Sequence, residues 1–269
     1  MNDASASAAA RGAKNSTALR ILARLGFAVN GLVHLLIGAL AIGIATGGGE
    51  TDADQSGAFQ QLASTPGGVF LLWAVVIGMF ALGAWLLISA FLMQPSDSKK
   101  KWAKRGAEAA KGITYFVLGS TALTFALGGS SDSSSSTSSL TADLMGNPVG
   151  IVVLVIAGVA VMGVGGFFIY KGVSQKFTED ISVPHNTLRS AVVGLGVAGY
   201  VAKGLAIGVA GVLVVVAAFT HDPEKSSGLD AALTSLTELP FGVVVLFVIA
   251  IGLIAYGVYC FVRARFARL

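Results

Sequence analysis

Residues 24–38 have the sequence RLGFAVNGLVHLLIG, and this frame returns at residues 105–119, RGAEAAKGITYFVLG, and at residues 197–211, VAGYVAKGLAIGVAG. Superposing the three stretches aligns glycines in two columns, Gly31/Gly112/Gly204 and Gly38/Gly119/Gly211. Glycine lets a neighbouring helix approach closely. The columns therefore predict a tightly packed helical frame that is repeated three times.

Each unit has a second half that begins with a proline. A leucine stands four residues before each proline, and a glycine stands two residues after it. Seventeen residues beyond the proline comes another glycine, and nineteen residues beyond comes an aromatic residue. Proline suits the first turn of a helix, and aromatic residues gather at membrane boundaries, so each unit is predicted to hold two helices. In chain order these columns are Leu62/Leu144/Leu236, Pro66/Pro148/Pro240, Gly68/Gly150/Gly242, Gly83/Gly165/Gly257 and Trp85/Phe167/Tyr259.

The composition is that of a membrane protein. Of the 269 residues, 54% are hydrophobic and only 12% are charged, about half the charged share of a soluble domain. The mean hydropathy is +0.78. Six apolar runs are each long enough to cross a hydrocarbon core of about 30 Å, and the first is too long for a cleaved signal peptide. These runs cover residues 25–46, 67–93, 107–128, 148–170, 188–219 and 241–262.

We therefore expect an all-α integral membrane protein with six transmembrane helices. They should form three tandem two-helix repeats arranged as a pseudo-threefold bundle. The expected divisions are a disordered cytoplasmic N-terminus over residues 1–18, whose small polar residues cannot bury a core, and repeats over residues 19–94, 95–176 and 177–269.

The basic residues indicate the orientation. Sixteen of the 18 Lys and Arg lie on one side: fourteen before the first run, between alternate runs or after the last run, and Lys111 and Arg189 near the starts of the third and fifth runs. Nine of the 14 acids lie in the three other loops. The positive-inside rule then predicts a multi-pass protein of the cytoplasmic membrane with both termini in the cytoplasm. Anionic lipid headgroups are the natural partner of this charge. We do not expect a nucleic acid as a partner of this charge.

The three loops on the opposite side differ from one another. Residues 55–64 are predicted to form a short helix on the outer surface, and residues 228–239 are expected to repeat it. The serine tract at residues 130–139 predicts a flexible, solvated segment.

The glycine columns, the proline-x-glycine entry and the ending AYGVYCFVRARFAR at residues 255–268 resemble the bacterial membrane protein family called domain of unknown function 1206. The resemblance covers nearly the whole chain from Arg20 onward, and Val197 departs from it where Arg24 and Arg105 stand in the other units. It implies three tandem two-helix modules of a kind frequent in actinobacteria. It implies no reaction.

Five polar positions within the apolar runs are candidates for function. Asn30, Lys111 and Lys203 form one column, and His34 and Tyr115 share another with Ile207. The lysines are expected near the inner membrane boundary, within reach of lipid phosphates, or alternatively as a basic ring around a cytoplasmic vestibule. His34 should lie deeper as a neutral side chain bonded to a hydroxyl or carbonyl of a neighbouring helix.

The remaining patterns suggest little chemistry. Glu108 and Lys111 are spaced for an ion pair within a helix. Glu50, Asp52 and Asp54 lack the rest of a calcium loop, and Cys260 is the only cysteine, so no disulfide framework exists. The sequence shows no nucleophile elbow, phosphate loop or zinc motif, and we expect neither catalysis nor a metal or cofactor.

Three functions remain open. The first is a non-catalytic envelope scaffold or accessory subunit that acts through helix packing with other membrane proteins. The second is a permease or channel for a small solute or ion along the pseudo-threefold axis. The third is binding of a lipid or apolar ligand between repeats.

Overall fold

The structure, a computed structural model, describes residues 17–48, 51–92, 99–182, 188–226 and 228–268, and within these ranges the chain is almost entirely helical. Six long helices carry the repeats: α2 (Thr17–Ala45), α4 (Gly68–Leu92), α5 (Lys99–Ala126), α7 (Pro148–Val173), α8 (Leu188–Thr220) and α10 (Gly242–Phe266). Shorter elements connect them: α3 (Gln55–Ser64), α6 (Ser133–Met145), η1 (Lys176–Asp180), η2 (Pro223–Ser226), α9 (Gly228–Ser235) and η3 (Leu236–Glu238).

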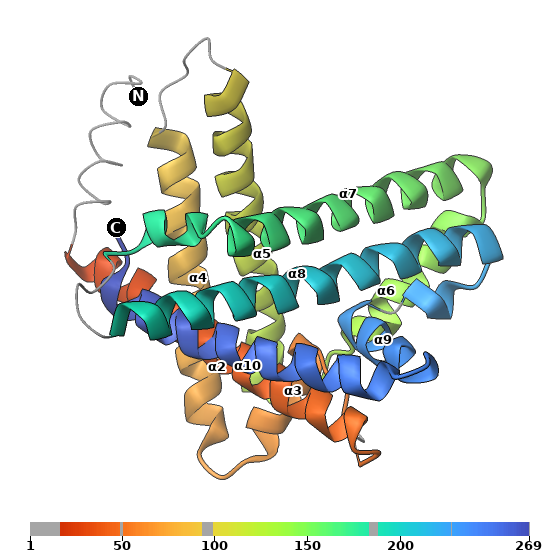
Figure 1. The fold of residues 1–269 in the computed structure, drawn as a ribbon, viewed down its shortest axis with the longest axis horizontal. Helices are drawn as coiled ribbons and strands as arrows, with labels where there is room; N and C mark the ends of the chain where they lie inside the picture. Colours follow the sequence, from red (N-terminus) through yellow and green to blue (C-terminus); the bar gives the residue numbers. More distant parts are fainter. Residues whose placement is uncertain (1–16, 49–50, 93–98, 183–187, 227, 269) are drawn as a thin grey trace.

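The long helices pack as three intimate pairs, α2 with α10, α5 with α4, and α8 with α7 (Figure 1). In each pair the first helix of one module lies against the second helix of the preceding module, with the last module taken as preceding the first. The pairing is therefore cyclic, as a triplicated chain with threefold symmetry requires.

The glycine columns form these contacts. A Cβ added at Gly31 would lie 2.7 Å from the carbonyl oxygen of Gly257, and one added at Gly257 would lie 2.8 Å from that of Gly31. Gly112 and Gly83 oppose one another in the same way, as do Gly204 and Gly165. These glycines lie at tight contacts between helices, which is the role that the sequence predicts for their columns.

The second columns meet the same partners further along. Gly38 packs on the backbone of Ala250 and on Ile254, Gly119 on Met79 and Phe80, and Gly211 on Gly158 and Met162. Each pair of helices is thus in contact at two positions along its length, one for each glycine column.

A different set of small residues joins the two helices within a module. In module 1, Gly26 of α2 packs on Gly78 of α4, and in module 3, Gly252 of α10 packs on Ala202 of α8. Gly199, the module 3 counterpart of Gly26, packs on Tyr256. These contacts join the three pairs into one body.

Module 2 lacks this contact. The positions equivalent to Gly26 and Gly78 hold Ala107 and Ala160, and both alanines are exposed. Over the described residues α5 and α7 make at most a marginal contact, and Figure 1 shows the α4–α5 pair and the α7–α8 pair pointing in different directions. The expected pseudo-threefold bundle therefore needs a correction: its cyclic pairing exists, but the ring is open at module 2. An alanine methyl at both positions opposes the close approach that glycine permits.

Opening the ring leaves α7 with one neighbouring long helix, α8. Only 17% of the residues in the apolar window of α7 are buried, against 50% in α2 and α10. We call the space between α5 and α7, flanked by Ala107 and Ala160, the module 2 gap.

The proline-x-glycine entry has a local cause. A Cβ at Gly68, Gly150 or Gly242 would collide with the carbonyl group of Leu62, Leu144 or Leu236, the leucine four residues before each proline. The chain folds back on itself there, and only glycine leaves room. The repeated leucine, proline and glycine columns encode this turn.

Five of the six predicted spans are helices long and apolar enough to cross a membrane: α2, α4, α7, α8 and α10. The sixth, α5, forms as a helix but does not meet that standard of apolarity. Lys111 and the charged residues before it lower its hydropathy most, and Thr114, Ser120, Thr121 and Thr124 lower it further. Each of these hydroxyls donates to a backbone carbonyl four residues earlier.

The short helices α3 and α9 appear where the sequence predicts them. The prediction of a flexible serine tract is wrong, because Ser133–Met145 is the helix α6. The Asp132 carboxylate accepts the backbone N–H of Ser135 at 2.9 Å and caps this helix, and the hydroxyl of Ser133 bonds that of Ser56 in α3.

The expected disordered segment at residues 1–18 lies outside the described residues except for Thr17 and Ala18, which begin α2.

Two glycines of α8, four residues apart, give a test of the packing. A Cβ at Gly204 would lie 2.6 Å from the Gly165 carbonyl oxygen, whereas a Cβ at Gly208 meets nothing within 4 Å. We expect Gly204→Ala to lower the free energy of unfolding by about 1–3 kcal/mol through overpacking. Gly208→Ala should leave it unchanged or raise it by up to about 1 kcal/mol. Thermal unfolding in detergent compares the two, and equal effects would contradict the assignment of Gly204 to the helix contact.

Candidate polar site inside the helical bundle

Two of the predicted polar positions lie together on α2. Asn30 is 5% exposed and His34 is 7% exposed. The side-chain amide of Asn30 donates to the sulfur of Cys260 in α10 at 3.4 Å. Cys260 is a free, buried thiol, so the hydrogen bond ties α2 to α10 one turn from the Gly31–Gly257 contact.

His34 bonds at both ring nitrogens. Its Nδ1 lies 2.8 Å from the carbonyl oxygen of Asn30, and its Nε2 lies 3.0 Å from the Nζ of Lys203 in α8. A carbonyl oxygen only accepts and an ammonium only donates. Nδ1 therefore carries the proton and Nε2 accepts from Lys203, which makes His34 a neutral imidazole. The sequence predicted a neutral histidine but expected a carbonyl or hydroxyl of a neighbouring helix, and the partners are its own helix and a lysine.

Lys203 is held by aromatic faces rather than by a carboxylate. Its Nζ lies 4.5 Å from the ring centre of Tyr256 and 5.2 Å from that of Phe168. The imidazole of His34 also packs on Tyr256, with ring centres 4.7 Å apart. Among the described residues no acid forms an ion pair with Lys203. Aromatic faces attract a cation but carry no net charge to balance it.

A second charged group lies on the side of the site nearer the start of α2 and the end of α10, which we call the basic end. Asp180 of η1 accepts from Lys171 at 2.6 Å and pairs with Arg263 at 3.5 Å. Burial disfavours the carboxylate of Asp180, but Arg263 and Lys171 outweigh that penalty and hold its pKa below the ordinary value. Lys111 adds a smaller contribution in the same direction, so this lysine of α5 lies within electrostatic reach of η1.

An aromatic cluster separates the site from solvent at the basic end. Phe177 of η1 is fully buried. It stacks on Tyr200 with ring centres 5.3 Å apart and meets the ring of Tyr259 edge-on at 5.2 Å. A β-bridge between Ile181 and Ala267 ties this segment to the end of the chain.

The other two predicted positions do not join this hydrogen-bonded group. Lys111 pairs with Glu108 at 2.9 Å, as the sequence predicted, and its side chain is 49% exposed. Tyr115 is half-buried and packs against the cluster formed by Ala23, Phe27 and Trp85. The column Asn30/Lys111/Lys203 therefore divides, with its first and last members at the polar site and Lys111 at the edge of the module 2 gap.

Several residues of the site were not singled out from the sequence: Phe168, Lys171, Phe177, Asp180, Tyr200, Tyr256, Cys260 and Arg263. In the sequence, only two features indicated this region: the aromatic column that ends at Tyr259, and the arginines in the last residues of the chain. The modules contribute different side chains to the polar site. Superposing the repeats therefore aligns no column of residues that marks this site.

The acids at the other end of the molecule have structural roles. Asp54 caps α3 by accepting the backbone N–H of Gly57 at 2.9 Å, and Asp230 of α9 accepts that of Ala53 at 2.7 Å. Burial, with a smaller contribution from the nearby Asp52 and Asp230, raises the pKa of Asp54 to about 6 against the opposing cap hydrogen bond. Glu50, the third acid of the weak cation motif, lies outside the described residues.

Long apolar helices, a threefold internal repeat and a polar group held between them define a membrane-type helical bundle protein built from tandem modules. The model of the family called domain of unknown function 1206 matches residues 25–92, 108–175 and 198–267. The chain belongs to this family, and the resemblance expected from the sequence is confirmed.

One curated relative is an uncharacterised protein of Bacillus subtilis (strain 168), YxxB. It is 30% identical over 246 residues, which cover 89% of this chain and 88% of the relative. No solved structure matches the chain significantly.

The raised pKa of Asp54 predicts a pH dependence of stability. Its folded-state pKa of about 6 exceeds the ordinary value of 3.8, so the native state binds this proton more tightly. The resulting stabilisation is complete below about pH 4 and is lost as the pH rises through about 6. Asp54→Asn keeps a good helix cap and removes the buried charge. We expect it to raise the free energy of unfolding at pH 7.5 by up to about 3 kcal/mol, the equivalent of that pKa shift.

Unfolding in detergent from pH 4 to pH 8 provides the measurement. The exposed Asp143→Asn, on α6 at the same end, serves as the matched control and should leave the profile unchanged. A profile for Asp54→Asn that parallels the wild type at every pH would contradict the buried charge.

Proposed function

We propose that this protein is a non-catalytic, multi-pass protein of the cytoplasmic membrane that holds a lipid in its module 2 gap. In this proposal α5 crosses the membrane with the five other long helices, and the basic end faces the cytoplasm. The observation that carries the proposal is the open ring. The two helices of module 2 part from one another, whereas those of modules 1 and 3 pack closely.

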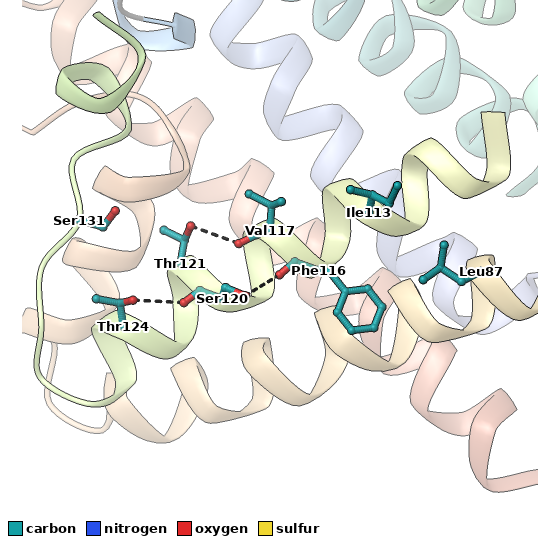
Figure 2. A pocket seen from close by; sticks show the side chains of 8 residues that line it. All are labelled: Leu87, Ile113, Phe116, Val117, Ser120, Thr121, Thr124 and Ser131. Atoms are coloured by element: carbon teal, nitrogen blue, oxygen red, sulfur yellow. Dashed lines mark hydrogen bonds between the residues drawn. The ribbon is translucent and has the colours of Figure 1, made fainter. Parts of the chain in front are cut away.

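A surface groove along α5, bordered by Leu87 of α4, suits an acyl chain. The groove has a volume of about 540 Å³ and is lined by apolar side chains that include Leu87, Ile113, Phe116 and Val117. Figure 2 shows that the hydroxyls of Ser120, Thr121 and Thr124 in this groove turn back to backbone carbonyls of the same helix. Their hydrogen-bond donors are thereby satisfied, so these three of the four hydroxyl side chains in the groove leave its surface largely apolar.

An accessory-subunit function is the second candidate, and a separate observation favours it. On the exposed surface of α7 a Cβ at Gly163 or Gly166 would meet nothing within 4 Å. Large apolar side chains such as Ile156, Val159 and Phe167 surround these glycines. A small-residue stripe of this kind lets a transmembrane helix of another subunit approach closely.

The channel hypothesis gains no such support. It requires polar groups of all three modules to converge on one axis. Asn30 and Lys203 lie at one packed site, whereas Lys111 pairs with Glu108 near the surface.

Lipid retention provides the test. After extraction of the full chain in native bilayer particles and transfer to detergent, mass spectrometry should find about one lipid per chain that resists further washing. Val117→Trp fills the α5 groove and should reduce this retained lipid several-fold. Ile156→Trp, on the exposed surface of α7, is the matched control and should retain it.

A wild-type chain that loses all lipid on washing would contradict the proposal. Stoichiometric recovery of a second membrane protein that Ile156→Trp abolishes would instead support the accessory-subunit candidate.

A further inference from the structure

Four cations lie at or near the polar site, and we call them the basic rim. Lys171 and Arg263 share Asp180, Lys203 lies over Phe168 of α7, and Lys111 of α5 is within electrostatic reach of Asp180. Two carboxylates accompany them. Glu108 pairs with Lys111, and Asp180 is shared by Lys171 and Arg263. The rim therefore has more positive than negative charge among the described residues, and Lys203 carries the clearest part of the excess.

Lys203 has an incomplete set of partners. An ammonium has three N–H donors, and one of them is directed to the Nε2 of His34. The aromatic rings of Phe168 and Tyr256 cover other directions. A cation at this position without a counter-charge is costly in a membrane, and an anion bound beside it would lower that cost.

The structure restricts how an anion could reach Lys203. At the basic end the fully buried Phe177 and Tyr259 and the nearly fully buried Tyr200 close the approach from water. Toward the middle of the bundle Ile37 and Leu253, 1% and 2% exposed, form a packed core. Phe168 and Lys203 themselves are partly exposed, and Phe168 belongs to α7, the helix that borders the module 2 gap. A ligand that enters there comes from the bilayer.

We infer that the basic rim binds the headgroup phosphate of a phospholipid with net negative charge, while its acyl chains lie along the α5 groove. This inference rests on the proposed function, since it names the lipid that the gap would hold. The ammonium of Lys203 contacts the phosphate directly, and Lys111, on the opposite wall, contacts it from α5. Lys171 and Arg263 remain engaged with Asp180 and contribute at longer range.

The excess positive charge of the basic rim favours a lipid headgroup with net negative charge. A zwitterionic phospholipid has a cation of its own, which the excess positive charge of the rim repels. A phosphatidylglycerol headgroup has none. Because charge-assisted hydrogen bonds are about twice as strong as neutral ones, the loss of one such contact should be visible in affinity.

The test is native mass spectrometry of the full-length chain in detergent, titrated separately with phosphatidylglycerol and with phosphatidylcholine. We expect the wild type to bind phosphatidylglycerol about tenfold more tightly. Lys203→Met should remove most of that preference and leave phosphatidylcholine binding unchanged, whereas Lys203→Arg should keep it. Lys225→Met, at the opposite end of the molecule, is the matched control and should behave as the wild type does.

The outcomes separate the two proposals. Equal affinity of the wild type for the two lipids overturns the headgroup inference and leaves lipid retention intact, and this comparison needs no variant. Preservation of the full preference in Lys203→Met overturns the role of the rim. Failure of the wild type to bind either lipid overturns the proposed function itself.

Discussion

The structure depends on direct contact between glycine backbones of helices from successive modules. Three pairs bring two helices so close that an added Cβ would lie only 2.6–3.1 Å from a carbonyl oxygen: Gly31 with Gly257, Gly112 with Gly83, and Gly204 with Gly165. Because the first helix of each module uses the second helix of the preceding one, no module is complete alone. The last helix closes on the first, so the start of α2 and the end of α10 lie together.

This constraint also builds the polar site. The α2–α10 contact places Asn30 beside Cys260, and the α8–α10 contact places Lys203 over Tyr256 and against His34. Within module 2, Ala107 and Ala160 replace the glycines that join α2 to α4 in module 1, and α5 and α7 part. Two alanines in place of two glycines thus accompany the open gap of module 2, whereas the glycines of module 3 allow the α8–α10 contact that holds Lys203 over Tyr256.

The sequence predicted the modules, the positions of the long helices and the glycine contacts, because a threefold repeat supplies three observations of each packing position. It did not predict the open ring, since an alanine in a glycine column changes only one methyl group at each position. It also missed Tyr256, Arg263 and Asp180, which act at a site formed by unlike parts of different modules. The α6 helix escaped prediction because Asp132 and tertiary contacts override a serine-rich composition.

The central claim is that module 2 is open, and a disulfide between positions 107 and 160 tests it most directly. In a chain whose native thiol is removed by Cys260→Ser, the pair Ala107→Cys and Ala160→Cys should remain reduced under mild oxidation in membranes. The pair Ser56→Cys and Ser133→Cys, whose native hydroxyls touch, should form a disulfide under the same conditions and shows that oxidation occurs. Rapid, complete bridging of positions 107 and 160 would mean that α5 and α7 pack as closely as their counterparts, and it would contradict the open ring.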